Sequence, residues 1–553
     1  MATVLDGFTP YPPEFIARYH AMGYWENRSL ASFFDEICAR FSDRIALISG
    51  DERVTYHQLG QRAERLALHL LDLGLSPGDS IVMQLPNVPE FVYLYLALQK
   101  MGVLPVMALP PHRYSEISHF VRLSRAVAYA IPESIGDFAF VEMAERIRGE
   151  NDHLRWIFVA GQAKFPGWVS LGSLLQTESE RLPERLADVE IDPAMPALFL
   201  LSGGTTGVPK LIPRTHNDYI YNTKVAAAIN DIQPDDKLLV VLPLAHNFPL
   251  ACPGLQGFLL HGACAVLGTS TRSEDIFSLI ERHGVTHLEL VPTLLIRLLN
   301  EPLLEHYDLS SIRIINTGGQ KLQSEVKRRT EELLPNCKVQ EVFGMAEGLL
   351  CYVRLDDPDE LRYETAGRPV SPGDEIRLVD DEGNDVPEGE IGELLVRGPY
   401  TLRGYFRAPE YNARTFTPDG FYSTGDLMRR HLSGNYIVEG RKKDLINRGG
   451  EKISAEEVEN LILSHPGVLN VACVPMPDRV LGERMCAFVI PQPGMTLSLD
   501  DISRFLLDRG IAKYKLPERL ELVDSFPLSN VGKVSKLALT RLITEKLAAE
   551  QKE

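Results

Sequence analysis

The sequence predicts an α/β protein with a large N-terminal domain and a small α+β C-terminal domain. Three observations lead to this prediction. In the first part of the chain, apolar strand-like runs alternate with helix-like runs, which is typical of parallel sheets. From residue 374 the pattern changes to alternating strand with Gly and Asp turns. A compact mixture of helices and strands follows residue 440, and a chain of 553 residues favours more than one domain.

The first strand–helix–strand unit lies at residues 79–109. The run DSIVMQL (79–85) predicts one strand and VLPVMAL (103–109) predicts the next. Between them, residues 87–102 predict a helix with Asn87 as its N-cap, Pro89 in its first turn and Gly102 directly after its end. Two strands that flank one helix are expected to lie parallel in the same sheet.

The same order recurs further along the chain. HLEL (287–290) predicts a strand, PTLLIRLL (292–299) a helix and IRIINTGG (312–319) another strand. By contrast, residues 374–398 alternate apolar and polar positions between Gly and Asp turns, and no helix fits there. We therefore expect a small β-rich subdomain to complete the N-terminal domain.

The C-terminal domain is expected to begin after a stretch dense in charge and glycine, GRKKDLINRGGEKIS (440–454). Residues 454–465 and 499–510 predict helices, and residues 468–476 and 485–491 predict strands. We place the boundary at Lys443, which gives domains of residues 1–442 and 443–553.

Composition excludes several classes of function. The chain has 57 basic and 75 acidic residues and a formal net charge of −18, so a nucleic-acid backbone would be repelled and no nucleic-acid partner is expected. Seven cysteines contain no C-x-x-C pair, which favours free thiols over a disulfide framework or a zinc site. The N-terminus lacks a signal-peptide pattern, and the apolar runs are far shorter than the roughly 18 residues that span a bilayer. We expect a cytoplasmic protein with no membrane partner.

A glycine-rich loop follows an apolar run at LSGGTTGVPK (201–210). It is not the Walker pattern, because Val208 and Pro209 separate the last glycine from Lys210. Glycines let backbone N–H groups converge on an anion, and threonine hydroxyls add donors. By itself the loop is compatible with either a phosphate site or an ordinary turn.

Four further motifs decide between these alternatives. VFGMAEG lies at 342–348, YSTGDL at 422–427, GRKKDLINRGGEKI at 440–453 and LSNVGKV at 528–534. With the loop, and in this order, they resemble the adenylate-forming superfamily: acyl-CoA synthetases, the adenylation domains of nonribosomal peptide synthetases, and luciferases. The resemblance extends from about residue 30 to about residue 539.

This resemblance implies a reaction in two halves. A carboxylate attacks the α-phosphate of ATP and gives an acyl adenylate and pyrophosphate. A thiol then displaces AMP and forms a thioester. The glycine-rich loop would hold the β- and γ-phosphates, through the residues Ser202, Gly203, Gly204, Thr205, Thr206, Gly207 and Lys210.

The resemblance also assigns residues to the rest of the nucleotide. Glu347 would hold Mg²⁺, a hard cation that prefers oxygen ligands. Asp426 would accept both ribose hydroxyls, and Arg441 would lie against the ribose and phosphate. The adenine would lie among Gly318, Gly319, Gln320, Val342, Phe343 and Gly344.

Two lysines carry the remaining roles that the resemblance implies. Lys533 would bridge the substrate carboxylate and the α-phosphate, where charge neutralisation is strongest in the transition state. Lys443 would lie at a hinge about which the C-terminal domain rotates between the two half-reactions. Without the motifs, both would be read as surface lysines.

The stretch PLAHNFPLACPG (243–254) indicates which carboxylic acid the protein would activate. Amino-acid adenylation domains carry an Asp for the substrate amine near this position, whereas this chain has the neutral Asn247. With LIPRTHNDY (211–219), the stretch is similar to the stand-alone aryl acid–AMP ligases of siderophore biosynthesis. The similarity implies that His246 precedes the pocket, that Asn247 binds a 2-hydroxyl and that Phe248 forms an aromatic wall. A His–Asn pair that serves only the core is the alternative.

The resemblance also places Gly318 at the acid pocket, and two further pocket positions bear on the choice of aryl acid. Ligases for 2,3-dihydroxybenzoate tend to carry Ser where this chain has Cys252, and Val where it has Leu350. Cys is a poor hydrogen-bond donor, and Leu is larger than Val by one methylene. Both residues therefore leave less room and no good hydrogen-bond partner for a 3-hydroxyl. The resemblance therefore implies salicylate, with 2,3-dihydroxybenzoate as the alternative. Cys252 is not expected to act as a nucleophile.

The sequence says less about the thiol that accepts the acyl group than about the acid. Nothing after Lys533 resembles a carrier domain, so the resemblance implies a separate aryl carrier protein with a phosphopantetheine arm, and coenzyme A is the rival acceptor. A non-catalytic relic of the fold is disfavoured because Glu347, Asp426 and Lys533 are all present. An oxidative, luciferase-like activity does not fit the aryl acid signature.

Overall fold

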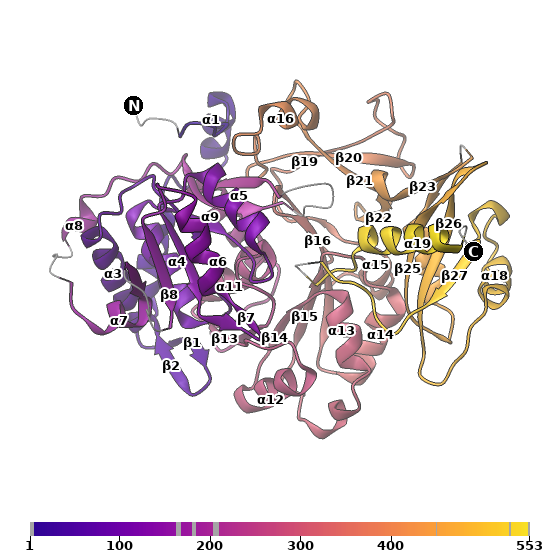
Figure 1. Cartoon of the computed structure of the whole chain (residues 1–553), viewed down its shortest axis with the longest axis horizontal. Helices are drawn as coiled ribbons and strands as arrows, with labels where there is room; N and C mark the ends of the chain where they lie inside the picture. Colours follow the sequence, from indigo (N-terminus) through magenta and orange to yellow (C-terminus); the bar gives the residue numbers. More distant parts are fainter. Residues whose placement is uncertain are drawn as a thin grey trace.

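The protein was analysed as a computed structural model, which describes residues 5–161, 167–179, 184–202, 209–449, 451–529 and 532–550. The first 150 residues and the C-terminal part lie at opposite ends of the molecule (Figure 1). A four-stranded sheet lies between them.

Four large sheets organise the chain. A seven-stranded sheet has the order β11 (Leu211–Thr215), β10 (Pro196–Leu201), β4 (Leu104–Met107), β3 (Ser80–Met83), β5 (Ala128–Pro132), β8 (Trp156–Ala160) and β9 (Trp168–Ser170). A nine-stranded sheet has the order β18 (Arg368–Pro369), β17 (Gly348–Tyr352), β16 (Lys338–Met345), β15 (Ile314–Gly318), β14 (His287–Leu290), β12 (Lys237–Val240), β13 (Cys264–Leu267), β1 (Ile45–Ser49) and β2 (Glu52–Thr55).

The other two sheets lie in the second half of the chain. The four-stranded sheet comprises β19 (Glu375–Val379), β20 (Ile391–Arg397), β21 (Tyr422–Arg430) and β22 (Tyr436–Arg441). The last sheet comprises β24 (Glu451–Ser454), β23 (Leu445–Arg448), β26 (Gly482–Pro491) and β25 (Val468–Asp478), with β27 (Arg519–Leu522) paired to β26. A small hairpin joins β6 (Ser134–Ile135) and β7 (Phe138–Ala139).

The helices cover these sheets. They are α1 (Pro13–Ala21), α2 (Leu30–Arg40), α3 (Tyr56–Asp72), α4 (Pro89–Met101), α5 (Tyr114–Ser124), α6 (Phe140–Gly149), α7 (Leu171–Gln176), α8 (Glu184–Ala187), α9 (His216–Ala227), α10 (Asn247–Ala251), α11 (Gly254–Leu260), α12 (Ser273–His283), α13 (Pro292–Leu299), α14 (Ser324–Leu333), α15 (Asp359–Glu364), α16 (Pro409–Thr415), α17 (Ala455–Leu463), α18 (Leu499–Asp508) and α19 (Lys536–Glu550). The short 3₁₀ helices are η1 (Pro302–His306), η2 (Lys442–Asp444) and η3 (Lys513–Lys515). Among the helices described, none is long and apolar enough to cross a membrane.

The predicted α/β class is confirmed. β3 and β4 pair in parallel across α4, and β14 and β15 pair in parallel across α13, as the repeated order of apolar runs predicts. β19 and β20 pair antiparallel, as expected for the β-rich region. The sheet of the C-terminal part begins at Leu445, two residues beyond the predicted boundary at Lys443.

One predicted helix cap is wrong. α4 begins at Pro89 with Val88 as its N-cap, and Gly102 closes it in the left-handed conformation as predicted. Asn87 instead joins two sheets: its Nδ2 donates to carbonyl oxygens at the ends of β12 and β13, and its Oδ1 accepts from the N–H of Leu244. Tertiary hydrogen bonds of a buried amide outweigh its local capping preference.

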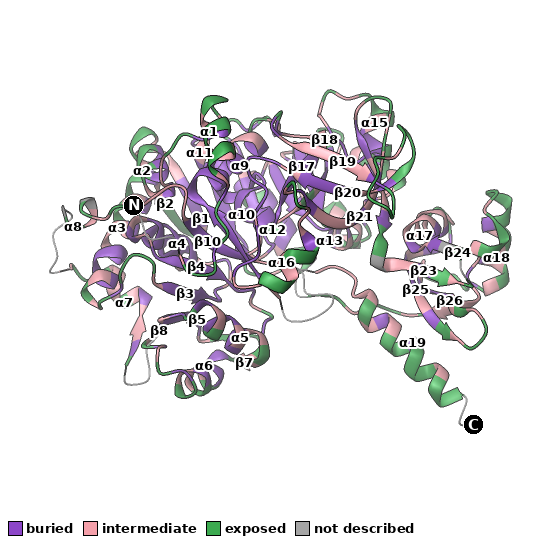
Figure 2. Ribbon diagram, turned by 90° about the horizontal axis from the view of Figure 1, so that it is seen from above, coloured by how far each residue is buried: buried purple, intermediate pink, exposed green. Residues whose placement is uncertain are grey.

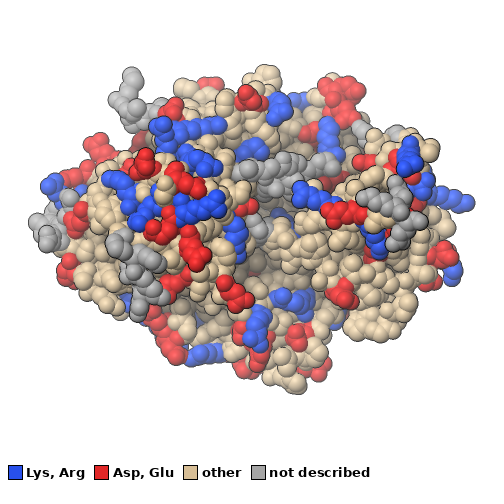
Figure 3. All heavy atoms as spheres, in the orientation of Figure 1, with Lys and Arg blue, Asp and Glu red and all other residues tan. Residues whose placement is uncertain are grey.

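The core is concentrated in the N-terminal part. Figure 2 shows mostly buried residues there and more exposed or half-buried residues in the C-terminal part. On the face drawn in Figure 3, acidic and basic side chains are intermingled. All seven cysteines are free thiols, as their spacing predicts.

Candidate functional site

The glycine-rich loop is closed at its base by two hydrogen bonds. β10 ends at Leu201 and pairs antiparallel with β11, which begins at Leu211. Between them, the N–H of Ser202 donates to the carbonyl of Lys210 at 3.0 Å, and the N–H of Lys210 donates to Oγ of Ser202 at 2.9 Å. The other predicted members of the loop lie outside the described residues: Gly203, Gly204, Thr205, Thr206 and Gly207.

The Lys210 ammonium lies against aromatic rings. Its Nζ is 3.8 Å from the ring centroid of Tyr411 and 5.7 Å from that of Tyr405, both within the range of a cation–π contact. Burial lowers the pKa of Lys210, and the negative charge of Glu347 opposes that shift. The base of the loop and Glu347 are therefore close enough to interact electrostatically.

Glu347 lies in the turn between β16 and β17, and its side chain is almost fully buried. Its Oε1 accepts a hydrogen bond of 2.8 Å from the hydroxyl of Tyr405, which is 3.0 Å from the hydroxyl of Tyr422. Burial raises the pKa of Glu347, and the bond from Tyr405 opposes the rise. Among the described residues no group of three His, Cys, Asp or Glu side chains could hold a metal alone. A single positioned carboxylate does fit Mg²⁺ that is held mainly by nucleotide phosphates and water.

Two adjacent glycines, Gly318 and Gly319, lie at the end of β15 and are together termed the glycine surface. Gly318 ends β15 opposite Val342 of β16, and a Cβ at Gly318 would lie 2.7 Å from the Val342 carbonyl. Gly319 follows with φ of +89°, a conformation that favours glycine. A Cβ at Gly319 would lie 2.6 Å from Cε and 3.1 Å from Nζ of Lys533, so the lysine side chain passes over this glycine.

The other residues predicted to surround adenine lie along the same strands. Gln320 follows Gly319 and is half-buried. Phe343 is half-buried and Gly344 is exposed, in the strand that pairs with β17. A Cβ at Gly344 would lie 2.5 Å from Cδ2 of Leu350, so the absence of a side chain lets Leu350 pack against this strand.

Asp426 and Arg441 form an ion pair across neighbouring strands. They are directly opposite in the β21–β22 ladder, and Nε of Arg441 is 2.7 Å from Oδ1 of Asp426. Asp426 is buried, which raises its pKa, while the charges of Arg441 and Lys533 oppose the rise. The Lys533 ammonium is therefore near Asp426 as well as Gly319.

Lys533 lies in a tight turn, and the neighbouring Gly532 accepts a hydrogen bond from the N-terminal part. Leu528 and Val534 form a β-bridge, and the N–H of Lys533 donates to Oγ of Ser529 at 3.2 Å. The hydroxyl of Thr293, on α13, donates to the carbonyl of Gly532 at 2.9 Å. The backbone of Lys443 lies in η2, directly before the last sheet.

The predicted acid pocket is built by α10 and the residues that flank it. His246 is the N-cap of α10, and its Nδ1 accepts from the N–H of Phe248. Burial and, to a smaller extent, the nearby Lys533 charge lower the pKa of His246 to about 3, so the ring is neutral. Oδ1 of Asn247 accepts from the hydroxyl of Tyr219 at 2.9 Å, and its Nδ2 donates to Sγ of Cys252 at 3.2 Å.

The predicted pocket residues share one hydrophobic cluster. Phe248, Cys252, Val342 and Leu350 are buried together in it. Burial raises the pKa of Cys252 to about 12, so the thiol stays protonated, in line with the expectation that it is not a nucleophile. The predicted pocket residues therefore share a buried cluster with Val342, one of the residues predicted to surround adenine.

The motifs did not identify three of the polar partners in this region. Tyr219 and Asn222, on α9, contact Asn247 and Cys252 respectively, and Tyr405 contacts Glu347. A signal for Asn222 was present, because Asp218, Asn222 and Thr223 are polar residues at helical spacing. Their burial could be recognised only in the folded protein.

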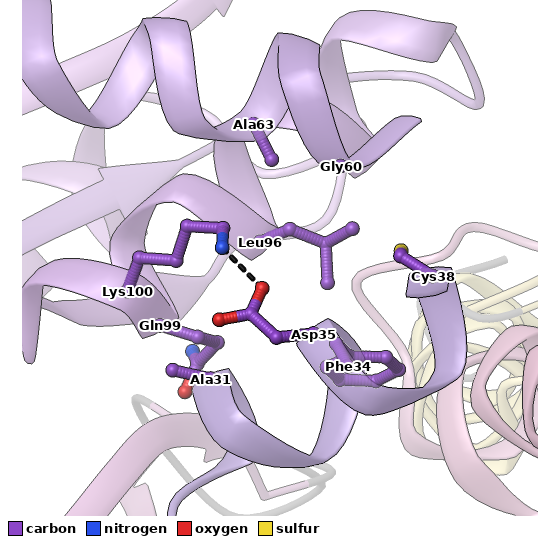
Figure 4. A pocket seen from close by; sticks show the side chains of 9 residues that line it. All are labelled: Ala31, Phe34, Asp35, Cys38, Gly60, Ala63, Leu96, Gln99 and Lys100. Carbon is purple, nitrogen blue, oxygen red and sulfur yellow. Dashed lines mark hydrogen bonds and ion pairs between the residues drawn. The ribbon is translucent and has the colours of Figure 1, made fainter. Parts of the chain in front are cut away.

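A small cavity elsewhere is lined mainly by apolar atoms (Figure 4). It lies between α2, α3 and α4, and two of its lining residues, Lys100 and Asp35, form an ion pair. None of the predicted site residues lines it.

Comparison with known proteins identifies the family of the chain. The family model described as AMP-binding enzyme matches residues 34–406, and the model described as AMP-binding enzyme C-terminal domain matches residues 457–533. The chain is 46% identical to a salicylyl-CoA synthase / salicylate adenylyltransferase of Streptomyces sp, covering 98% of each chain. It is 45% identical to a 2,3-dihydroxybenzoate-AMP ligase of Bacillus subtilis, covering 99% of each. It is 42% identical to a salicyl-AMP ligase / salicyl-S-ArCP synthetase of Mycobacterium tuberculosis, covering 97% of this chain and 94% of the relative.

These matches cover more than half of the chain and extend nearly from end to end in the relatives. The chain therefore belongs to the AMP-binding enzymes and, within them, to the aryl acid–AMP ligases.

Proposed function

We propose that the protein is a salicylate–AMP ligase. It activates salicylate with ATP to salicyl-AMP and pyrophosphate, then transfers the salicyl group to the phosphopantetheine thiol of an aryl carrier protein in siderophore biosynthesis. The observation that carries the proposal is the position of the Asn247 carboxamide, buried beside Cys252 and close to the glycine surface that Lys533 covers.

The nucleotide would lie along Gly318 and Gly319, with Phe343 on its other side. Asp426 is suited to the two ribose hydroxyls because a carboxylate can accept two hydrogen bonds, and Arg441 is paired beside it. Glu347 would hold Mg²⁺, which neutralises phosphate charge when it is bound. Tyr405 supports this role because its hydroxyl fixes the Glu347 carboxylate.

In the first half-reaction, a carboxylate oxygen of salicylate attacks the α-phosphorus. A P–O bond forms to the acid, the P–O bond to the β-phosphate breaks, and pyrophosphate leaves. Lys533 would neutralise the charge that builds between carboxylate and α-phosphate, and an ammonium near both Asp426 and His246 is in reach of that region. Ser202 and Lys210 would hold the leaving phosphates, together with the rest of their loop.

Two side chains support salicylate over 2,3-dihydroxybenzoate. Cys252 and Leu350 are both buried in the cluster that includes Phe248, so neither an open space nor a strong polar partner is available at those positions for a 3-hydroxyl. The relatives include ligases for each acid at nearly equal identity. 2,3-Dihydroxybenzoate is therefore the second candidate substrate.

In the second half-reaction, a thiolate attacks the acyl carbon and AMP leaves. We propose that the domains of residues 1–442 and 443–553 rotate about Lys443 between the two steps, which withdraws Lys533. One relative is named a salicyl-S-ArCP synthetase, which supports an aryl carrier protein as acceptor, and another is named a salicylyl-CoA synthase, which supports coenzyme A as the rival.

Acid-dependent ATP–pyrophosphate exchange over a panel of aryl acids tests the proposal. Salicylate should give the highest kcat/KM, 2,3-dihydroxybenzoate a lower one, and amino acids none. Exchange that is fastest with 2,3-dihydroxybenzoate would overturn the substrate assignment. Thioester formation should then be compared between a phosphopantetheinylated aryl carrier protein and coenzyme A, and a preference for coenzyme A would overturn the acceptor assignment.

A further inference from the structure

Tyr219 lies on α9 directly behind the predicted acid pocket. Its side chain is fully buried, and its hydroxyl donates to Oδ1 of Asn247 at 2.9 Å. Burial raises the pKa of Tyr219 well above its usual value, so the hydroxyl retains its proton. The phenol is therefore a permanent donor to the amide oxygen.

The position of Tyr219 is fixed from the other side by Arg214. The Arg214 guanidinium lies 4.8 Å from the ring centroid of Tyr219 and pairs with Asp218, one residue before Tyr219, at 2.9 Å. Arg214 also donates to the carbonyl of Ala346, next to Glu347. The phenol cannot move away from Asn247 without disturbing these buried contacts.

The bond from Tyr219 determines which end of the carboxamide faces the pocket. An amide has one accepting oxygen and an NH₂ group with two donors. The oxygen of Asn247 is occupied by Tyr219, and one N–H is directed to Sγ of Cys252 at 3.2 Å. The second N–H has no protein partner among the residues that the structure describes. The pocket therefore presents a donor at Asn247.

We propose that Tyr219 is a specificity-determining residue, which orients the Asn247 carboxamide so that the pocket selects aryl acids whose ortho substituent accepts a hydrogen bond. This inference rests on the proposed function, because it assumes that an aryl acid occupies the pocket. Tyr219 acts through Asn247 and is a positioning residue.

Three benzoates that differ only at the ortho position can distinguish orientation of the Asn247 amide by Tyr219 from a general effect of Tyr219 on the pocket. The ortho oxygen of salicylate accepts a hydrogen bond from an N–H, the ortho amine of anthranilate is chiefly a donor, and benzoate has no ortho group. A donor at Asn247 favours salicylate and disfavours anthranilate relative to benzoate, because a buried polar group facing a like group is left unpaired.

Tyr219→Phe tests the proposal. Without the phenolic donor, the amide can rotate so that its oxygen faces the pocket, since the Cys252 thiol can donate as well as accept. In ATP–pyrophosphate exchange, the salicylate-to-benzoate ratio of kcat/KM should fall about tenfold, the effect of one lost hydrogen bond, and the anthranilate-to-benzoate ratio should rise. An equal loss with all three acids would overturn the proposal, because it would indicate general damage to the pocket.

A matched control lies two residues along the same helix. The hydroxyl of Tyr221 is also buried and bonds to Oγ of Ser371 at 2.7 Å, away from Asn247. Tyr221→Phe should leave both ratios unchanged, and the same shift in this variant would overturn the assignment. If Tyr219→Phe does not fold, Asn247→Asp offers the same test, because a carboxylate can only accept and should also favour anthranilate over salicylate.

The parent enzyme distinguishes failure of this inference from failure of the proposed function. A parent that activates no aryl acid contradicts the proposed function itself. A parent that activates anthranilate as well as salicylate contradicts the orientation of the amide and leaves aryl acid adenylation intact. A parent that prefers salicylate, with unchanged ratios in Tyr219→Phe, contradicts only the role of Tyr219.

Discussion

The two halves of the site differ in how they are held. The proposed acid pocket, represented by Asn247 and Cys252, is built into the core of the N-terminal part and joined by buried hydrogen bonds. Lys533 comes from the C-terminal part, where fewer residues are buried (Figure 2). Among the described contacts, hydrogen bonds from Thr293 to Gly532 and from Ser454 to Glu439 join it to the N-terminal part.

Under the proposed function, this difference would separate specificity from catalysis. A pocket inside a close-packed core keeps one shape, because any change of volume there is resisted by its neighbours. A charge that comes from the C-terminal part, across contacts such as the bond from Thr293 to Gly532, could be withdrawn without repacking that core. The following experiments test whether the two halves can be altered independently.

The largest expected effect comes from removing the lysine. Lys533→Ala should reduce adenylate formation by about 10²–10³ or more, the usual cost of losing a donor that acts in the transition state. The same variant, given premade salicyl adenylate, should still transfer the acyl group to a carrier thiol. The measurement is the rate of each half-reaction, and an equal loss in both would contradict the separation of roles.

The hinge should show the opposite pattern. Lys443→Pro fixes φ in η2 and should oppose a rotation, so thioester formation should slow by about tenfold or more while exchange stays measurable. Single-turnover transfer to the carrier protein provides the measurement. Unimpaired transfer would place the hinge elsewhere.

The pocket can be changed without touching the lysine. Cys252→Ser combined with Leu350→Val should shift the ratio of kcat/KM toward 2,3-dihydroxybenzoate by about tenfold or more, since small pocket changes discriminate by about 1–3 kcal/mol. Exchange with the two acids gives the ratio. A ratio equal to that of the parent would mean that these side chains do not contact the ring.

A smaller effect is expected at the interface. Thr293→Val removes the hydrogen bond to the carbonyl of Gly532, whose net contribution is about 0.5–1.5 kcal/mol. Exchange should slow several-fold while transfer from premade adenylate is unchanged, and Thr293→Ser should restore the parent rate. Loss of both steps would indicate that Thr293 serves the fold of α13 instead.

The smallest expected effect depends on pH. Burial raises the pKa of Glu456, on α17, to about 7, with Lys321 and Lys536 opposing the rise and Glu459 and Glu341 adding to it. The docked arrangement, in which the C-terminal part lies against the N-terminal part, therefore favours neutral Glu456. The contribution of neutral Glu456 to the stability of this arrangement is fully present below the ordinary pKa near 4.3. It is lost as pH rises through about 7. The ratio of exchange rates between Glu456→Gln and the parent should rise from pH 6 to pH 8. A constant ratio would remove Glu456 from the docking equilibrium.

The sequence by itself determined the fold class and the family. Apolar runs of strand and helix length fix a parallel α/β arrangement because each run must bury its apolar side chains, and both predicted parallel pairs are present. The ordered motifs located the strand ends that form the glycine surface and the position of Glu347, because such local segments depend on backbone needs that glycine and turn residues reveal.

Only the tertiary structure decided how distant side chains pair. Asn87 was predicted to cap a helix, and it joins two sheets because its partners come from residues more than 150 positions away. The bond from Tyr219 to Asn247, the bond from Tyr405 to Glu347 and the reach of Lys533 over Gly319 are likewise long-range. A hydrogen bond between buried side chains is set by the packing of the elements that carry them, so local sequence patterns do not contain it.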